Sequence, residues 1–161
     1  MPTVILLLLK VSGGLMIEGV ILTPLKIINV SGGDVYHGMK ASDAGFVGFG
    51  EAYFSSVDTD VIKAWKKHNK MTLNLVVPVG RIGFVIFDDR KNSSTSGSHQ
   101  QEILGIHNYC RITIPPGLWF GFKGLSKDLN LLMNMANIEH TYLEGEKKSI
   151  DEFDYDWSSV K

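Results

Sequence analysis

The chain of 161 residues has little cysteine, little proline and no long run of charges of one sign. Its single cysteine excludes an intrachain disulfide and a thiolate metal site. Sixteen basic against 17 acidic residues give a net charge of −1, which argues against a nucleic-acid-binding protein. The 44% of apolar residues suffice for the core of one compact domain. We therefore predict a soluble, globular, cytoplasmic protein.

No membrane-spanning segment is expected at the N-terminus. The apolar run at residues 4–9 has six residues, far fewer than the roughly 20 that cross a bilayer. No basic segment precedes this run, as one would in a signal peptide. Residues 1–15 are interpreted either as an extension upstream of a start at Met16 or as an extra edge strand. Residues 16–161 are predicted to form the single domain.

Short strand-type segments dominate this domain. β-branched and aromatic residues, often alternating with polar ones, predict strands near 19–22, 25–30, 51–57, 73–79, 82–86, 103–105, 111–114 and 131–136. Gly80-Arg81 predicts the tip of a hairpin, and the prolines after residue 114 end another strand. Eight or more short strands with evenly spaced turns indicate an all-β sandwich or small barrel.

Three segments are less regular. Residues 58–68 fit the spacing of a helix about as well as that of a strand. Residues 144–156 are acidic and contain aromatics, which suggests one short C-terminal helix. Residues 91–101 are rich in serine and asparagine and predict a mobile loop.

Three separated motifs carry the functional signal: residues 61–68, 79–90 and 112–123, followed by Tyr155-Asp156-Trp157. In this order and spacing they resemble the dTDP-4-dehydrorhamnose 3,5-epimerase family, cupins that act on nucleotide-linked 4-keto sugars. The resemblance covers roughly residues 17 to 157. It implies a cupin-type antiparallel β-sandwich or jelly-roll barrel with little helix, and a homodimer.

The catalytic positions depart from the family pattern. Lys66 stands where the family has its histidine base, and His68 matches a second histidine of a shorter subgroup. Epimerisation beside a ketone needs a base for the C–H and a donor for the enolate. His68 is the better base, because histidine titrates near neutrality, whereas Lys66 would need a strongly lowered pKa. Asp151 (or Ser149) is the candidate for the group that orients the base, and the family's acidic tyrosine falls near Met133, which cannot donate a proton.

The resemblance also implies a sugar pocket. Glu51, Tyr53 and Ser55 lie on one face by the period of two and match positions that line this pocket. Arg90 is interpreted as a clamp on the nucleotide diphosphate or as an ion pair with a neighbouring aspartate. The other candidate substrate-binding residues are Lys63, Asn74 and Trp119, with core packing as the alternative for Trp119.

These observations lead to one expected function and two alternatives. Phe120 replaces a further cupin histidine, so we expect no bound metal and no cofactor. The resemblance implies an isomerase that acts on a dTDP-4-keto-6-deoxy sugar in polysaccharide or O-antigen biosynthesis. The alternatives are a degenerate relative that binds a nucleotide sugar or a partner enzyme, and a 3,4-ketoisomerase. Neither a nucleic acid nor a membrane is expected as a partner.

Overall fold

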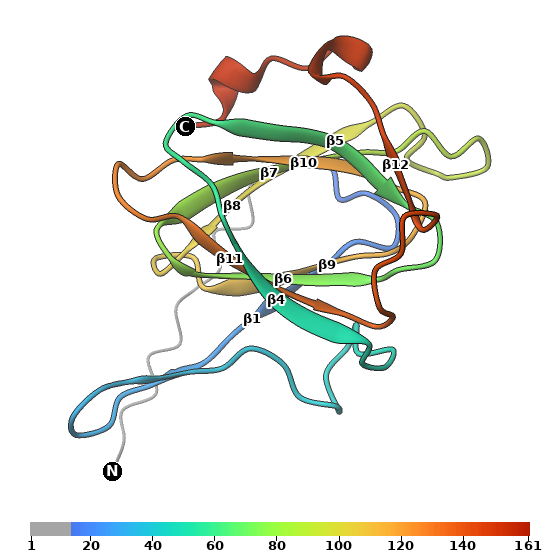
Figure 1. Ribbon diagram of the computed structural model, residues 1–161. Helices are drawn as coiled ribbons and strands as arrows, with labels where there is room; N and C mark the ends of the chain where they lie inside the picture. Colours follow the sequence, from blue (N-terminus) through green and yellow to red (C-terminus); the bar gives the residue numbers. More distant parts are fainter. Residues whose placement is uncertain (1–13) are drawn as a thin grey trace.

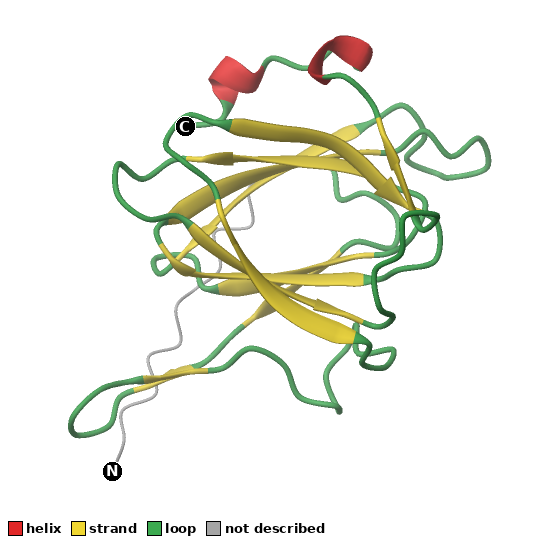
Figure 2. Ribbon diagram, in the orientation of Figure 1, coloured by secondary structure: helices red, strands yellow, loops and turns green. Residues whose placement is uncertain are grey.

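The computed structural model describes residues 14–161 as two five-stranded antiparallel sheets (Figures 1 and 2). The first sheet has the order β1 (Ile21–Pro24), β9 (Cys110–Ile114), β6 (Leu73–Val79), β11 (Leu131–Ala136) and β4 (Glu51–Ser56). The second sheet has the order β12 (Gly145–Lys147), β5 (Ile62–His68), β10 (Trp119–Gly124), β7 (Arg81–Phe87) and β8 (His99–Gly105). β2 (Ile27–Ile28) and β3 (Val35–Tyr36) form a separate two-stranded ribbon. The predicted all-β, cupin-type sandwich is confirmed.

The core lies between the two sheets, because alternating side chains of each strand point inward. In β7, Phe84 and Ile86 are fully buried in this core, while Val85 between them packs on the opposite face. From the first sheet, Leu75 and Ile112 join the same cluster. Full burial of such a side chain contributes roughly 1.5–3 kcal/mol, so these alternating positions dominate the stability of the fold.

A second apolar cluster covers the outer face of the second sheet. It contains Trp65 and Trp119 of the sheet, against which Trp157 and Val160 of the C-terminal segment pack. This segment forms two short 3-10 turns, η1 (Ile150–Glu152) and η2 (Trp157–Ser159), seen above β5 in Figure 1. The expected C-terminal helix over residues 144–156 does not form, because β12 pairs with β5 and the aromatic residues that follow it fasten the chain to the sheet.

Other local expectations differ in detail. The predicted hairpin at Gly80-Arg81 does not form, because β6 pairs within the first sheet and β7 within the second, so this turn connects the two sheets. The ambiguous segment 58–68 becomes strand β5, and a strand that we did not expect, β10, lies between β5 and β7. The predicted strand over residues 25–30 is reduced to β2, and β8 begins at His99, inside the predicted loop. Residues 1–13 are outside the described part of the chain, so the expected N-terminal extension or edge strand falls almost entirely there. Within residues 14–161, no helix is long and apolar enough to cross a membrane.

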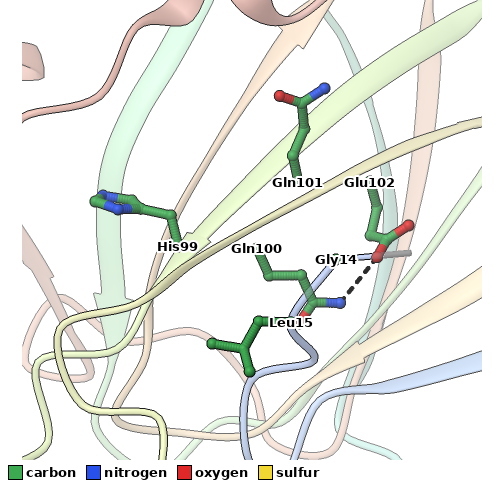
Figure 3. Close-up of a pocket in the computed structure, with 6 residues that line it drawn as sticks. All are labelled: Gly14, Leu15, His99, Gln100, Gln101 and Glu102. Atoms are coloured by element: carbon green, nitrogen blue, oxygen red, sulfur yellow. Dashed lines mark hydrogen bonds between the residues drawn. The ribbon is translucent and has the colours of Figure 1, made fainter. Parts of the chain in front are cut away.

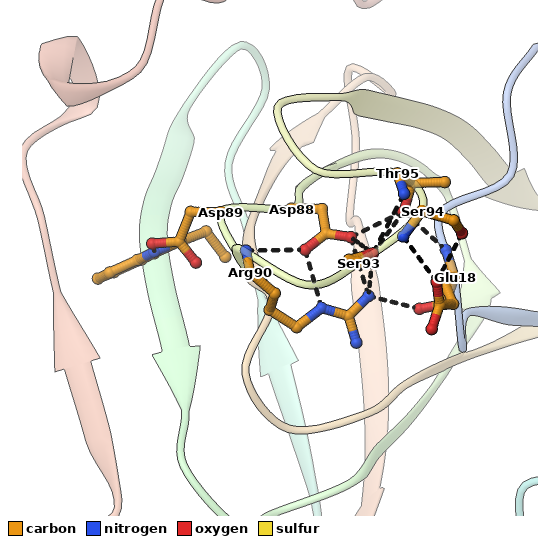
Figure 4. Close-up of polar contacts among 8 residues, drawn as sticks. Glu18, Asp88, Asp89, Arg90, Ser93, Ser94 and Thr95 are labelled. Atoms are coloured by element: carbon orange, nitrogen blue, oxygen red, sulfur yellow. Dashed lines mark hydrogen bonds and ion pairs between the residues drawn. The ribbon is translucent and has the colours of Figure 1, made fainter.

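The loop after β7 is hydrogen-bonded into place (Figure 4). The buried carboxylate of Asp88 accepts hydrogen bonds from Arg90 Nε at 2.8 Å and from Thr95 Oγ1 at 2.7 Å. Glu18 accepts a hydrogen bond from the Ser94 amide at 2.9 Å. The polar sequence that predicted a mobile loop therefore serves to anchor the N-terminal segment.

Candidate functional site

β4 and β5 lie in opposite sheets toward one edge of the sandwich (Figure 1). Polar side chains project from the inner faces of both strands. Lys66 pairs with Phe120, which belongs to the core, and paired residues of antiparallel strands project to the same face. Tyr53 pairs with Asn134, which in turn pairs with the core residue Leu75. Although Tyr53 and Lys66 face inward, both are exposed, Tyr53 to 41%. Solvent therefore enters the space between the sheets at this edge, which we call the open edge.

A β-bulge sets the side-chain directions in β5. Lys63 and Lys66 are three residues apart, so strict alternation would place them on opposite faces. The register shifts between Phe120 and Phe122 of β10, and these two inward residues pair with Lys66 and Lys63. As a result both lysines face the interior, while Trp65 between them packs in the outer cluster.

His68 ends β5 and is 8% exposed. Its ring stacks on Phe120, with ring centroids 6.1 Å apart, and meets His140 edge-on at 6.2 Å. The carboxylate oxygen of Glu144 lies 3.8 Å from Nδ1, which is longer than a hydrogen bond. Within the described residues, nothing forms a hydrogen bond with Nδ1. Packing therefore holds this ring, with Nδ1 buried beside the Glu144 carboxylate.

The surroundings of His68 favour its neutral form. Burial lowers the pKa of the imidazole, and the positive charge of Lys66 lowers it further, whereas Glu144 acts in the opposite direction. Because the net shift is downward, the ring is unprotonated at neutral pH and can accept a proton.

Glu144 is an anion inside this site. Its Oε1 accepts hydrogen bonds from the amides of Lys70 at 2.8 Å and Met71 at 2.6 Å. Burial alone would raise the pKa of Glu144, but these amides hold it below its usual value. Sequence reasoning missed Glu144, because it lies in the loop before β12 and only the fold brings it to His68.

Lys66 lies beside His68 in a cationic group. Although the residue as a whole is exposed, partial burial of its ammonium group lowers its pKa, and the charges of Lys147 and Lys63 lower it further. The Lys63 ammonium donates a hydrogen bond to the carbonyl of Ser56 at 2.7 Å, which links β5 to the end of β4. Lys66, His68, His140, Tyr142 and Lys147 line a cavity of about 170 Å³ at this edge. Lys67 and Glu146 also line it and form an ion pair at 3.4 Å, whereas no ion pair involves Lys66 or Lys147 within residues 14–161. This excess of amines makes the cavity attractive to an anion.

The three candidate residues of β4 face the space between the sheets from the opposite side. Their partners on β11 are Leu132 for Ser55, Asn134 for Tyr53 and Ala136 for Glu51. Leu132 and Ala136 belong to the inner core, so the side chains of Glu51, Tyr53 and Ser55 also face inward. The structure thus directs these residues into the space between the sheets, which Lys63, Lys66 and His68 face from β5.

Four candidates lie elsewhere. Trp119 faces the outer cluster and donates its indole proton to Asp89 at 2.8 Å. Asn74 lies on the outer face of the first sheet, where it donates a hydrogen bond to the carbonyl of Gly45 at 3.1 Å.

Asp151 and Arg90 are not available at the open edge. Asp151 is exposed in η1, and Trp65 holds that turn to the outer face by donating its indole proton to Ile150. Arg90 donates to both carboxylate oxygens of Asp88, at 2.8 and 2.9 Å, so the ion-pair interpretation describes it (Figure 4).

A second cavity of about 220 Å³ lies against β8 (Figure 3). Gln100 donates a hydrogen bond to Glu102 at 3.0 Å and accepts one from the Ile17 amide at 2.8 Å. Burial raises the pKa of Glu102. These contacts fasten the N-terminal segment to the sheet. Within the described residues, no group of three histidine, cysteine or acidic side chains could hold a metal ion.

Comparisons with known proteins agree with this architecture. No sequence-family model matches the chain. A dTDP sugar isomerase from Desulfovibrio desulfuricans is 36% identical, with a TM-score of 0.86 over 92% of this chain and 98% of that one. A 3′-monoepimerase from Streptomyces bikiniensis, crystallised with dTDP, has a TM-score of 0.80 over 92% of this chain and 79% of its own. Because it is only 14% identical, it supports the fold alone.

Two curated relatives match in sequence. A probable low-salt glycan biosynthesis epimerase from Haloferax volcanii is 33% identical over 62% of this chain and 64% of its own. A spore coat polysaccharide biosynthesis protein from Bacillus subtilis is 32% identical over 49% of this chain and 52% of its own. The match thus spans less than two thirds of either relative. The fold and the isomerase similarity together show that the chain belongs to the dTDP-4-dehydrorhamnose 3,5-epimerase-like family of sugar epimerases and isomerases.

Proposed function

We propose that this protein epimerises a dTDP-linked 4-keto-6-deoxy sugar, with His68 as the base. The observation that carries the proposal is a buried imidazole, kept neutral by its surroundings, beside Lys66 at the open edge. The similarity to a dTDP sugar isomerase over nearly the full length supports the substrate class. The named roles of the two curated relatives support a place in polysaccharide biosynthesis.

The chemistry follows from the charges of the site. A C–H bond next to a ketone is acidic enough for an imidazole base, provided that the enolate oxygen is stabilised. His68 accepts the proton, and the negative charge of the enolate develops near the ammonium group of Lys66. Glu144, 3.8 Å from His68 Nδ1, stabilises the imidazolium that results. These steps need only acid–base groups, and we propose that no cofactor takes part.

Substrate binding uses the same edge. A nucleotide diphosphate carries negative charge, which complements Lys63, Lys66 and Lys147 on β5 and β12. Glu51 and Ser55 offer hydrogen-bond acceptors and a hydroxyl donor to the sugar from β4. Trp119, Asn74 and Arg90 have no part in this proposal, since other groups of the protein already occupy them.

The test is conversion of dTDP-4-keto-6-deoxyglucose followed by NMR in D₂O. Deuterium at C3 and C5 with inverted products would support the epimerase. Exchange at C3 with a migrated ketone would instead identify a 3,4-ketoisomerase, which forms the same enolate. If the sugar binds and neither exchanges nor changes, the protein is a binding relative and the proposal fails.

A further inference from the structure

Inversion at a carbon beside a ketone places a geometric demand on the site. The enolate is planar, so the other epimer forms when a proton arrives on the face opposite to the one it left. His68 and Lys66 both belong to the second sheet, on one wall of the open edge. A donor to the opposite face is supplied most directly from the first sheet.

Tyr53 places a hydroxyl group on the wall that the first sheet forms. It lies on β4, the edge strand of the first sheet, and its register with Asn134 directs the ring into the space between the sheets. Its side chain is 41% exposed although it faces inward. A ligand in the open edge can therefore reach the phenol.

The hydrogen bond to Tyr53 leaves the phenolic proton free. Asn134, which is 3% exposed, donates from Nδ2 to the phenol oxygen at 2.9 Å. Because the oxygen accepts this bond, its own proton can be donated to another group. The same bond stabilises the phenolate that forms once the proton has left. A rigid, buried amide thus fixes the position of the phenol oxygen.

We propose that Tyr53 is the catalytic acid that protonates the enolate on the face opposite to His68, with Asn134 as its positioning residue. This inference rests on the proposed function. The Tyr53 proton moves to the carbon, the enolate electron pair forms the new C–H bond, and the ketone is restored. The phenolate then regains a proton from water, and His68 releases to water the proton that it took.

The test separates exchange from inversion in D₂O, with dTDP-4-keto-6-deoxyglucose as the probe. Tyr53→Phe is expected to keep C–H exchange within about tenfold of wild type, because His68 can return a solvent deuteron to its own face. Formation of the inverted sugar should fall at least about a hundredfold, the low end for a lost acid–base group. Asn134→Leu should lower inversion more than exchange. Tyr36→Phe on β3, away from the open edge, is the matched control and should change neither rate.

Each other outcome overturns the proposal. If Tyr53→Phe inverts the sugar at the wild-type rate, Tyr53 is not the acid. If it loses exchange together with inversion, Tyr53 serves enolate formation and the division of roles is wrong. If the wild-type protein shows no exchange at all, the proposed function fails first, and this inference fails with it.

Discussion

At the residue scale, one imidazole and its neighbours decide the chemistry. His68 was recognisable from the sequence, and Lys66 lies on the same inner face, as the spacing of two implies. The partner carboxylate was not recognisable. Asp151 is exposed in η1 on the outer face of the second sheet, whereas Glu144 is held beside His68 by the amides of Lys70 and Met71. Contacts of this kind depend on the path of a loop, which residue types do not encode.

The charges around His68 predict opposite shifts of the pH profile. Activity requires the neutral imidazole, so the acid limb of kcat/KM follows the pKa of His68. Lys66→Met removes a group that lowers this pKa and should move the limb to higher pH. Glu144→Gln removes a group that raises it and should move the limb to lower pH. Lys26→Met, at an exposed position, is the control. An acid limb that does not move in either Lys66→Met or Glu144→Gln would contradict the assignment of His68 as the base.

At the element scale, local patterns predicted strands well and side-chain directions less well. The chain passes from β6 in the first sheet to β7 in the second sheet at Gly80, which has a φ of +77°. A Cβ at this position would lie 2.4 Å from the carbonyl oxygen of Leu129, so the turn requires glycine. The bulge in β5 is different, because it arises from pairing with β10, a strand far along the chain. A sequence therefore shows that Lys63 and Lys66 are in a strand without showing that both face one site.

The hydrogen-bonded loop after β7 gives a prediction about stability. Burial raises the pKa of Asp88, but hydrogen bonds from Arg90, Ser93 and Thr95 hold it well below its usual value. A carboxylate with a lowered folded-state pKa stabilises the fold above the ordinary aspartate pKa, and this stability is lost as the pH falls below it. Asp88→Asn should lower the free energy of unfolding at neutral pH by about 2–4 kcal/mol, because Arg90 loses its buried partner. Urea denaturation measures this, with the exposed Asp128→Asn as control; equal stability of the two variants would refute it.

At the scale of the whole molecule, the sandwich leaves apolar side chains in solvent. Val47, Phe49 and Phe54 are 60%, 69% and 62% exposed. Exposed apolar groups in this number favour association, and the family resemblance implies a homodimer. We predict that light scattering gives twice the monomer mass at micromolar concentration. A monomer mass there would contradict the expected assembly.

The central claim is that His68 removes a proton from the sugar, and solvent-deuterium exchange tests it most directly. Wild-type protein should place deuterium next to the ketone of dTDP-4-keto-6-deoxyglucose, and His68→Asn should slow this exchange at least about a hundredfold. His107→Asn, at an exposed turn between β8 and β9, should exchange at the wild-type rate. Exchange that proceeds normally in His68→Asn would contradict the account.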